Sequence, residues 1–270
     1  MEIKNKKIRI KYNKYILSID YFIRKGRKIT LLYLHGLGCS KKDFEEALVI
    51  SELKDYKIVS FDFPGCGDSE YPKNLSLGMD DLVEITELVV SKLKLSNLII
   101  IGHSMGGLTS LLYAEKYKKR VLGFINVEGN LAPEDCFFSR KVIGYSFEEF
   151  KAKIFRNIKR IVNKKRNIGF QKYSKHLLKI NQRAYFDYCH TMTYYSDKGN
   201  LIERFLSLKI PKFFVFGSEN NKLSYIPYLK KKGCKTLEIP NSNHWPGYDN
   251  PKAYYNVIHN FVKNVIKRVQ

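Results

Sequence analysis

A serine flanked by two glycines is the most informative feature of this sequence of 270 residues. The pentapeptide Gly102-His103-Ser104-Met105-Gly106 lies between the apolar run NLIIIG and a small-residue segment typical of a helix start. Glycines on both sides permit a tight strand-to-helix turn with a strained serine at its tip. Backbone N–H groups at the start of the helix favour an anion that forms beside the hydroxyl. The pattern therefore predicts that Ser104 is a nucleophile.

A serine hydroxyl is a weak nucleophile at neutral pH and needs a base, which histidine can provide. Of the six histidines, His35 follows the first expected buried strand and His103 adjoins the serine. Three others fall in helical patterns, where a surface or core role is expected: His176, His190 and His259. His244 follows the last expected strand. We therefore expect His244 to take the proton of Ser104 and to return it to a leaving group.

Strands and helices must position these groups, and the two patterns alternate along most of the chain. A hairpin is expected over 3–12 and 15–23, and buried strands over 28–34, 57–63, 97–102, 121–127, 212–217 and 236–239. Amphipathic helices are expected in two places, one along the stripe Leu82, Ile85, Val89 and Leu93 and one over 251–269. This alternation predicts an α/β fold with a mostly parallel central sheet covered by helices on both faces.

The alternation stops between residues 133 and 208, where the sequence is helical in pattern, aromatic and basic. We expect an inserted helical cap there, with the core formed by 1–132 and 209–270. Within this insertion, Lys151 to Arg183 contains twelve Lys or Arg and no acid. Its apolar residues recur at helical spacing and predict a basic amphipathic helix: Ile154, Phe155, Ile158, Ile161 and Val162. A solvated outer face is one interpretation, and contact with an anionic membrane surface or acidic substrate is the other.

Composition narrows the class of protein. The first residues lack the apolar core of a signal peptide, and no run reaches the roughly 20 apolar residues that span a bilayer, so we expect a cytoplasmic protein. Five scattered cysteines form no CxxC pair, and no disulfide framework, metal site or organic cofactor is implied. The net charge is +22, but 37 of the 48 basic residues are lysines spread along the chain, and no nucleic-acid-binding module is recognisable.

Four segments in order resemble the α/β-hydrolase-fold superfamily over nearly the whole chain. They are His35-Gly36-Leu37-Gly38, the D-x-P-G-x-G-x-S turn at 62–69, the Ser104 pentapeptide and Asn243-His244-Trp245. The resemblance implies an α/β-hydrolase fold with a helical cap. It also implies that the backbone N–H groups of Leu37 and Met105 form an oxyanion hole. Asp62 and Asp68 belong to the turn, and we expect them to be structural.

The acid of the triad has two candidates under this resemblance. The family usually has an aspartate after the strand that here reads KFFVFG, but Asn220 occupies that position and Glu219 is adjacent. Members similar to haloalkane dehalogenases and coelenterazine luciferases instead have a glutamate after the strand that follows the nucleophile helix. Glu128 is at that position here, 24 residues beyond Ser104. We expect Glu128 to be the acid and keep Glu219 as the alternative.

Ser104, His244 and an acid beside an oxyanion hole suit acyl transfer from esters, thioesters or activated amides. We expect a carboxylesterase or lipase acting on small to medium apolar acyl esters. Aromatic residues of the insertion could form the wall of the acyl site: Phe137, Phe138, Tyr185, Phe186, Tyr188, Tyr194 and Tyr195. The alternatives are a carbon–carbon bond hydrolase, a slowly reacting ligand receptor of the same fold, and an aminopeptidase. An aminopeptidase would need a cap carboxylate for the substrate amine, for which the candidates are Glu134, Asp135, Glu148, Glu149 and Asp187.

Overall fold

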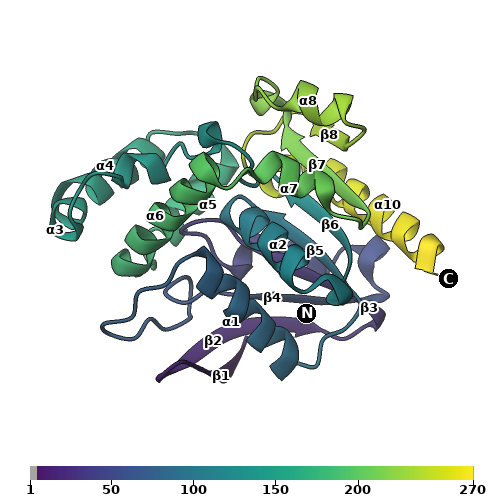
Figure 1. Ribbon diagram of the computed structural model, residues 1–270, viewed down its shortest axis with the longest axis horizontal. Helices are drawn as coiled ribbons and strands as arrows, with labels where there is room; N and C mark the ends of the chain where they lie inside the picture. The colour runs from purple at the N-terminus through teal and green to yellow at the C-terminus, as the bar shows by residue number, and fades with distance from the viewer. Residues whose placement is uncertain (1–4, 270) are drawn as a thin grey trace.

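An eight-stranded sheet forms the centre of the molecule (Figure 1) in the computed structural model, which describes residues 5–269. The strands are β1 (Lys6–Tyr12), β2 (Tyr15–Arg24), β3 (Arg27–Leu34), β4 (Tyr56–Phe61), β5 (Leu98–His103), β6 (Val121–Val127), β7 (Lys212–Gly217) and β8 (Lys235–Ile239). Their spatial order is β1-β2-β4-β3-β5-β6-β7-β8. The pairs β1–β2 and β2–β4 are antiparallel, and all other pairs are parallel. The expected α/β class with a mostly parallel sheet is confirmed.

Most expected strands differ from the observed ones by one or two residues. The hairpin is present as β1 and β2, although residues 3 and 4 of its expected first strand lie outside the described residues. The strand expected over 57–63 ends at Phe61. Its continuation is prevented because the carboxylate of Asp62 accepts hydrogen bonds from the backbone N–H groups of Lys41, at 2.7 Å, and Asp68, at 2.8 Å. These bonds hold a turn in place of an extended strand.

Helices cover both faces of the sheet, which is why its parallel strands are apolar on both sides. Leu32 and Leu34 of β3 belong to a buried cluster with residues of α1 (Met79–Lys92), α2 (Met105–Lys116) and α8 (Ile226–Lys231). Leu31 and Tyr33 point to the other face and share a second cluster with α10 (Pro251–Val269) and the short helix η1 (Lys41–Leu48). Alternate residues of one strand thus serve two layers of the core.

Every element between β6 and β7 is helical. The segment contains η4 (Pro133–Asp135), η5 (Ser139–Val142), α3 (Phe147–Glu149), η6 (Phe150–Ile154), α4 (Phe155–Asn163), α5 (Ile168–His176), α6 (Gln182–Lys198) and α7 (Leu201–Ser207). Hydrogen bonds join it to the turn at 62–69: Tyr188 donates to the carbonyl of Pro64 at 2.8 Å, and the N–H of Asn181 donates to that of Gly65 at 2.7 Å. The helices therefore rest on one edge of the sheet.

The basic amphipathic helix expected between Lys151 and Arg183 is present around its apolar stripe, in η6 and α4, but it does not continue to Arg183. The chain leaves the helical path between α4 and α5, in the sequence Lys164-Lys165-Arg166-Asn167. Three adjacent cations repel one another, and the side chain of Asn167 accepts a hydrogen bond from the N–H of Phe170 at 3.1 Å. That bond begins a new helix, because asparagine at this position satisfies a free N–H group of the first turn.

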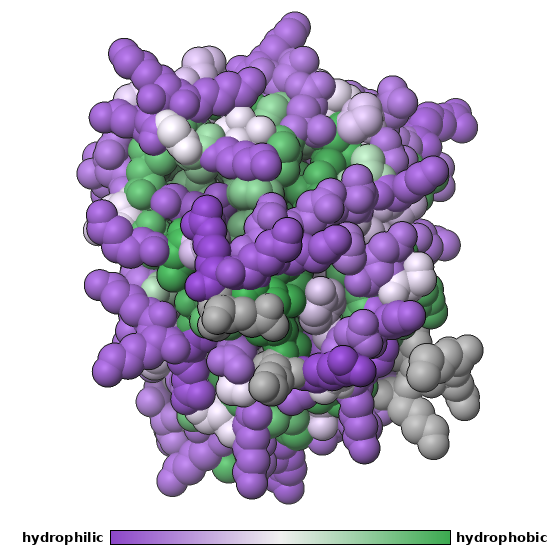
Figure 2. Space-filling view, turned by 90° about the vertical axis from the view of Figure 1, so that its right-hand side faces the viewer, coloured by the Kyte–Doolittle hydropathy of each residue, from purple (hydrophilic) through white to green (hydrophobic). Residues whose placement is uncertain are grey.

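Charged side chains dominate the outside of the molecule. Figure 2 shows one face on which hydrophilic side chains surround smaller apolar patches. Over residues 5–269, the structure contains no helix that is both long and apolar enough to cross a membrane.

Candidate active site

Five strand ends bring the candidate residues together. In the order β3-β5-β6-β7-β8, neighbouring strands run parallel, so their carboxyl ends meet at one edge of the sheet. His35 follows β3, Ser104 follows β5 and Glu128 follows β6. Asn220 follows β7, and His244 lies in the loop after β8. Residues far apart in the sequence thus converge because of strand order alone.

Ser104 occupies a strained turn between β5 and α2. Its backbone has φ 52° and ψ −121°, a conformation that is uncommon for any residue except glycine. The neighbouring glycines allow the close packing that this turn requires. A Cβ atom on Gly106 would lie 2.1 Å from the carbonyl oxygen of Leu34, and one on Gly102 would lie 2.3 Å from Oγ of Ser110. The turn predicted from the glycine spacing is therefore present, with Ser104 at its tip.

Glu128 contacts the imidazole of His244. The carboxylate Oε2 lies 3.4 Å from Nδ1 of His244, and both side chains are buried. The N–H of Gly217 donates to Oε1 at 2.7 Å, and the Asn220 amide donates to both carboxylate oxygens at 3.1 Å. These donors hold the carboxylate in place beside His244. Asn220 follows β7, at the position where the family usually has its acid. Its amide here binds the carboxylate of Glu128, which follows the neighbouring strand β6.

Glu219 lies outside this contact. Its side chain is exposed, and its N–H donates to the carbonyl of Ser242 at 3.0 Å. Among the described residues, the carboxylate paired with His244 is that of Glu128. The geometry thus favours the first of the two acids considered from the sequence.

His103 is a part of the site that the sequence reasoning did not assign. It is buried, and its Nε2 donates to the backbone carbonyl of His244 at 2.7 Å. Burial, together with the nearby His244, lowers the pKa of His103 to about 3. The ring is therefore neutral at physiological pH and carries its proton on Nε2. Its position beside the nucleophile was the available signal, but the sequence did not reveal its partner.

The loop after β3 lies against Ser104. A Cβ atom on Gly36 would be 3.1 Å from Cβ of Ser104, so a larger residue there would crowd the serine. The buried His35 fixes the loop, since its Nδ1 donates to the carbonyl of Gly36 at 2.8 Å and its Nε2 accepts from the N–H of Phe63 at 3.0 Å. Burial lowers the pKa of His35, which keeps this tautomer neutral.

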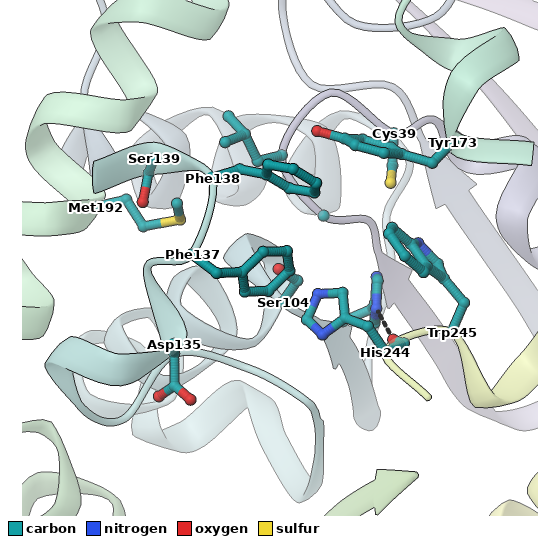
Figure 3. A pocket seen from close by; sticks show the side chains of 13 residues that line it. Cys39, Ser104, Asp135, Phe137, Phe138, Ser139, Tyr173, Met192, His244 and Trp245 are labelled. Carbon is teal, nitrogen blue, oxygen red and sulfur yellow. Dashed lines mark hydrogen bonds between the residues drawn. The ribbon is translucent and has the colours of Figure 1, made fainter. Parts of the chain in front are cut away.

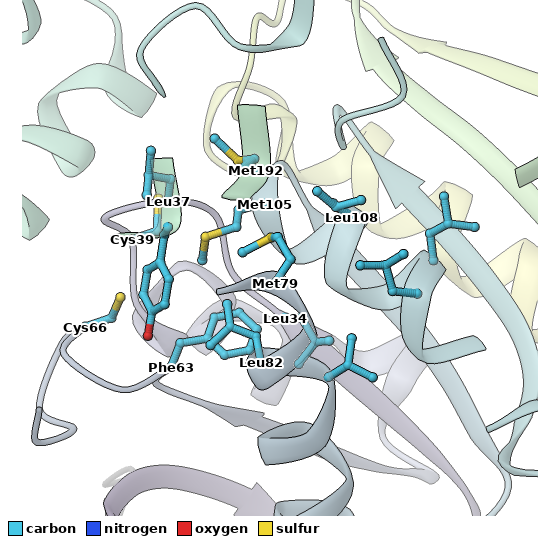
Figure 4. Packing of buried hydrophobic residues seen from close by; sticks show 14 of the residues in the cluster. Leu34, Leu37, Cys39, Phe63, Cys66, Met79, Leu82, Met105, Leu108 and Met192 are labelled. Atoms are coloured by element: carbon cyan, nitrogen blue, oxygen red, sulfur yellow. The ribbon is translucent and has the colours of Figure 1, made fainter. Parts of the chain in front are cut away.

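The two residues expected to form the oxyanion hole come from different elements. Leu37 belongs to the loop after β3, and Met105 directly follows Ser104. Leu37 lines the pocket around Ser104. Met105 is the first residue of α2, and its side chain points into the core beside Met79 (Figure 4). The first N–H groups of a helix have no partner within it, so the N–H of Met105 is available to a ligand. The side chain of Met105 thus serves packing.

A narrow pocket surrounds Ser104 and His244 (Figure 3). Its open volume is about 20 Å³, enough for little more than one water molecule. The ring of Phe137 packs edge-on against His244 with the ring centres 4.9 Å apart, and 42% of Phe137 is exposed. Phe137 therefore lies between the imidazole and solvent.

The aromatic wall only partly matches the expected one. Of the seven aromatic residues considered from the sequence, Phe137 and Phe138 line the pocket. Tyr185 and Tyr188 are buried in the core, and Tyr194 is 67% exposed. Tyr173 and Trp245 complete the wall, and Phe138 stacks on Tyr173 with ring centres 5.7 Å apart. Tyr173 could have been found only by knowing which side of α5 faces inward.

Of the five acids considered for binding an amine, only Asp135 lines the pocket. Its oxygens accept hydrogen bonds from the N–H groups of Leu131 and Ala132 and from the hydroxyl of Tyr225. Burial raises the pKa of Asp135 to about 7, despite the opposing effect of these hydrogen bonds. The Asp135 carboxylate therefore stabilises its own turn through these hydrogen bonds, and it is a poor partner for a substrate amine.

Asp62 and Asp68 surround a buried cation. Nζ of Lys41 lies 2.8 Å from Asp62, 2.7 Å from Asp20 and 3.7 Å from Asp68. The three carboxylates come close enough together to hold a metal ion, but the ammonium of Lys41 already occupies the space among them. This arrangement is structural, as the sequence predicted for Asp62 and Asp68.

Comparisons with known proteins agree with this architecture. The family model for the alpha/beta hydrolase fold matches residues 29–165. A Mycoplasma genitalium protein described as an esterase/lipase is 26% identical over 93% of this chain and 95% of its own length. A proline iminopeptidase of Saccharolobus solfataricus is 24% identical over 89% of this chain and 87% of its own. A carboxylesterase structure from Nitrososphaera gargenis superposes with a TM-score of 0.78 at 17% identity, over 97% of this chain and 100% of that one.

Proposed function

Because this chain belongs to the α/β-hydrolase-fold family, we propose that it is a serine hydrolase of carboxylic esters whose triad is Ser104, His244 and Glu128. The observation that carries the proposal is the contact of Glu128 with His244, in a pocket that both His244 and Ser104 line. In this proposal residues 133–208 form a cap over a core made of 1–132 and 209–270.

Each residue has one role in the proposed reaction. His244 takes the proton of Ser104 as Oγ attacks the ester carbonyl carbon, and Glu128 stabilises the imidazolium that forms. The negative oxygen of the tetrahedral intermediate accepts hydrogen bonds from the N–H groups of Leu37 and Met105. When the carbon–oxygen bond breaks, His244 returns the proton to the departing alcohol. Water activated by His244 then hydrolyses the acyl-enzyme and regenerates Ser104.

The substrate class follows from the walls of the pocket. Phe137, Phe138, Tyr173, Met192 and Trp245 surround the serine with apolar surface, which suits an acyl chain. The proline iminopeptidase among the relatives raises the alternative of an amine-bearing substrate. Asp135 is the pocket acid available for such an amine, and its oxygens are already bonded within its own turn. A neutral acyl ester of small size is therefore the better match.

The first experiment compares the protein with its Ser104→Ala variant on p-nitrophenyl esters of increasing acyl length and on proline p-nitroanilide. We expect ester hydrolysis with a preference for short chains, lost in the variant by a factor on the order of 10⁴ or more. Equal activity in the two proteins would overturn the assignment of Ser104. Faster cleavage of the anilide than of every ester would favour a peptidase, and tight ligand binding without turnover would favour a receptor.

A further inference from the structure

Helix α5 has two faces of different character. Its inner face is buried and lines the Ser104 pocket through Tyr173, whose ring centre is 5.2 Å from that of Trp245. Residues 168, 172 and 175 recur at i, i+4 and i+7 and therefore share the opposite side of the helix. Ile168, Lys172 and Lys175 are all exposed there. The helix thus separates the pocket from a surface that the hydrolytic site does not use.

Cations dominate this outer side. Residues 151–183, all of which the structure describes, include twelve Lys or Arg and no acid. Three of the twelve form ion pairs, Lys151 with Glu148, Lys179 with Asp68 and Arg183 with Asp187, and the other nine form none with the described residues. We define the α5 surface as Lys165, Arg166, Ile168, Lys172, Lys175 and Leu178.

Two aliphatic side chains project among these cations. Ile168 is 52% exposed and Leu178 is 77% exposed, one at each end of α5. Isolated exposed aliphatic residues are common, but here both lie beside several exposed cations, with the neutral Gln171 exposed on the same side of the helix. Helices that lie in the interface of an anionic bilayer typically have lysine and arginine around exposed aliphatic residues.

We propose that the α5 surface binds the headgroup layer of an anionic lipid bilayer. The cations pair with lipid phosphates while Ile168 and Leu178 enter the boundary with the acyl chains. A single-stranded nucleic acid would use exposed aromatic rings for stacking, whereas Phe170 is half-buried and packs on Trp245 with ring centres 4.8 Å apart.

A cleft lies beside α5, but the charges that line it do not suit a small anion. This cleft, of about 450 Å³, separates α5 from η1. Lys172, Lys175 and Lys179 line it, but so do Glu45, Glu46 and Asp68. Its charge is mixed, whereas the open surface around Lys165 and Arg166 has cations without nearby acids in its own sequence segment. An extended anionic layer therefore matches the charge distribution better than a single buried anion.

The test is sedimentation of the full-length protein with vesicles of phosphatidylcholine, alone or mixed with phosphatidylglycerol. We expect binding only to the mixed vesicles and its loss between about 0.05 and about 0.5 M NaCl. The double variant K165Q/R166Q should bind about 25-fold more weakly, or about fivefold for each cation. The variant I168S/L178S should bind about tenfold more weakly at unchanged charge.

A matched control separates a specific surface from the overall charge. K263Q/K267Q removes two exposed lysines from the C-terminal half of α10, which runs to the right-hand side of Figure 1, away from α5. This variant should bind as the unchanged protein does. The face on that side is also strongly hydrophilic (Figure 2). Equal losses in the α5 and α10 variants, absence of vesicle binding, or binding of duplex DNA in place of vesicles would each overturn the proposal. Thermal unfolding of every variant checks its fold independently of hydrolysis, and the Ser104→Ala variant should bind unchanged.

Discussion

Ser104 and Glu128 share an unusual backbone conformation. Each follows one of two neighbouring parallel strands, and each has φ 52°, in the left-handed region. Such residues cost on the order of 1–3 kcal/mol and persist where the surrounding structure determines them. Here the N–H of Glu128 donates to the carbonyl of Val215, and the N–H of Ser104 donates to that of Val127. The ladder of the sheet thus holds both turns, with Glu128 against His244 and Ser104 in the pocket that His244 also lines.

Replacement of the two candidate acids distinguishes their roles. We expect Glu128→Gln to lower kcat on the order of 10³-fold or more, because an amide cannot stabilise the imidazolium of His244. Glu219→Gln should change kcat by less than about twofold, since an exposed side chain away from the imidazole contributes little. The measurement is kcat of both variants on the best p-nitrophenyl ester. The opposite ranking would transfer the acid's role to Glu219.

His103 is expected to act as a positioning residue for His244. Loss of its N–H donor in His103→Phe should lower kcat by about 10- to 100-fold, because a small displacement of the base weakens proton transfer. His103→Gln keeps an N–H donor and should recover part of the loss. With its pKa lowered to about 3, His103 does not titrate in the working range, so the acid limb of the pH profile should keep its midpoint in His103→Gln. A fall in stability with no change in kcat would assign His103 to packing alone.

Phe137 is expected to limit the size of the substrate. It packs on His244 at the open side of a pocket of about 20 Å³. Phe137→Ala should shift the preferred p-nitrophenyl ester to a longer acyl chain and raise kcat/KM for it by about 10-fold or more, an effect comparable with that of one or two methylene groups in an apolar pocket. The same change at the exposed Tyr194 is the control and should leave the preference unchanged. An unaltered chain-length profile in Phe137→Ala would show that the ring does not bound the acyl site.

At the scale of elements, one ion pair joins α5 to η1. Nε2 of His176 lies 2.6 Å from Asp43, to which the hydroxyl of Tyr248 also donates at 2.8 Å. Burial by itself lowers the pKa of His176, but the charge and hydrogen bond of Asp43 outweigh it and raise that pKa. Burial acts to raise the pKa of Asp43, and His176 overcomes it and lowers that pKa to about 2. The pair fastens the helical segment to the core.

The pair predicts a dependence of stability on pH. Because the pKa of His176 is raised by folding, its contribution is complete below about pH 6.5, the ordinary histidine pKa, and is lost as pH rises through the raised value. Because the pKa of Asp43 is lowered, its contribution is present above about pH 4 and is lost as pH falls through about 2. In urea unfolding, His176→Gln should therefore destabilise the protein more at about pH 5.5 than at about pH 9. The control is His190→Gln on α6, which has no carboxylate partner among the described residues. Equal destabilisation by His176→Gln at both pH values would contradict the ion pair.

At the scale of the whole molecule, the net charge of +22 should oppose folding. Like charges on a compact protein repel one another, and salt screens them over a Debye length of about 10 Å at 0.1 M. We expect the free energy of unfolding, measured with the uncharged denaturant urea, to rise between about 0.01 and about 0.3 M NaCl. Sucrose at matched osmolality is the control for effects other than screening. A free energy that falls with NaCl would mean that attractive pairs such as Arg204–Glu115 outweigh the repulsion.

Much of the fold was predictable because its signals are local. The alternation of apolar strands with amphipathic helices can be recognised from residues that are close in the sequence. The strands 121–127 and 212–217 accordingly begin and end where they were expected. The basic helix expected over 151–183 formed only as far as Asn163, because capping by Asn167 begins a second helix. Hydrophobic periodicity reports where apolar residues recur. It does not show where a side chain forms a hydrogen bond with a backbone N–H group and so ends one helix and begins another.

The sequence by itself determined the class of chemistry: the glycine-flanked serine, the late histidine and the two acids are visible as residue types at fixed spacings. It ranked Glu128 above Glu219 only through a family resemblance, without showing the contact of Glu128 with His244, and it did not find Tyr173 or the bond from His103 to His244. Those facts depend on which strands are neighbours and which side of a helix faces inward. Only the tertiary structure decides them, because strand order brings together residues separated by more than a hundred positions, as for His103 and His244, and such contacts leave no trace in local pattern.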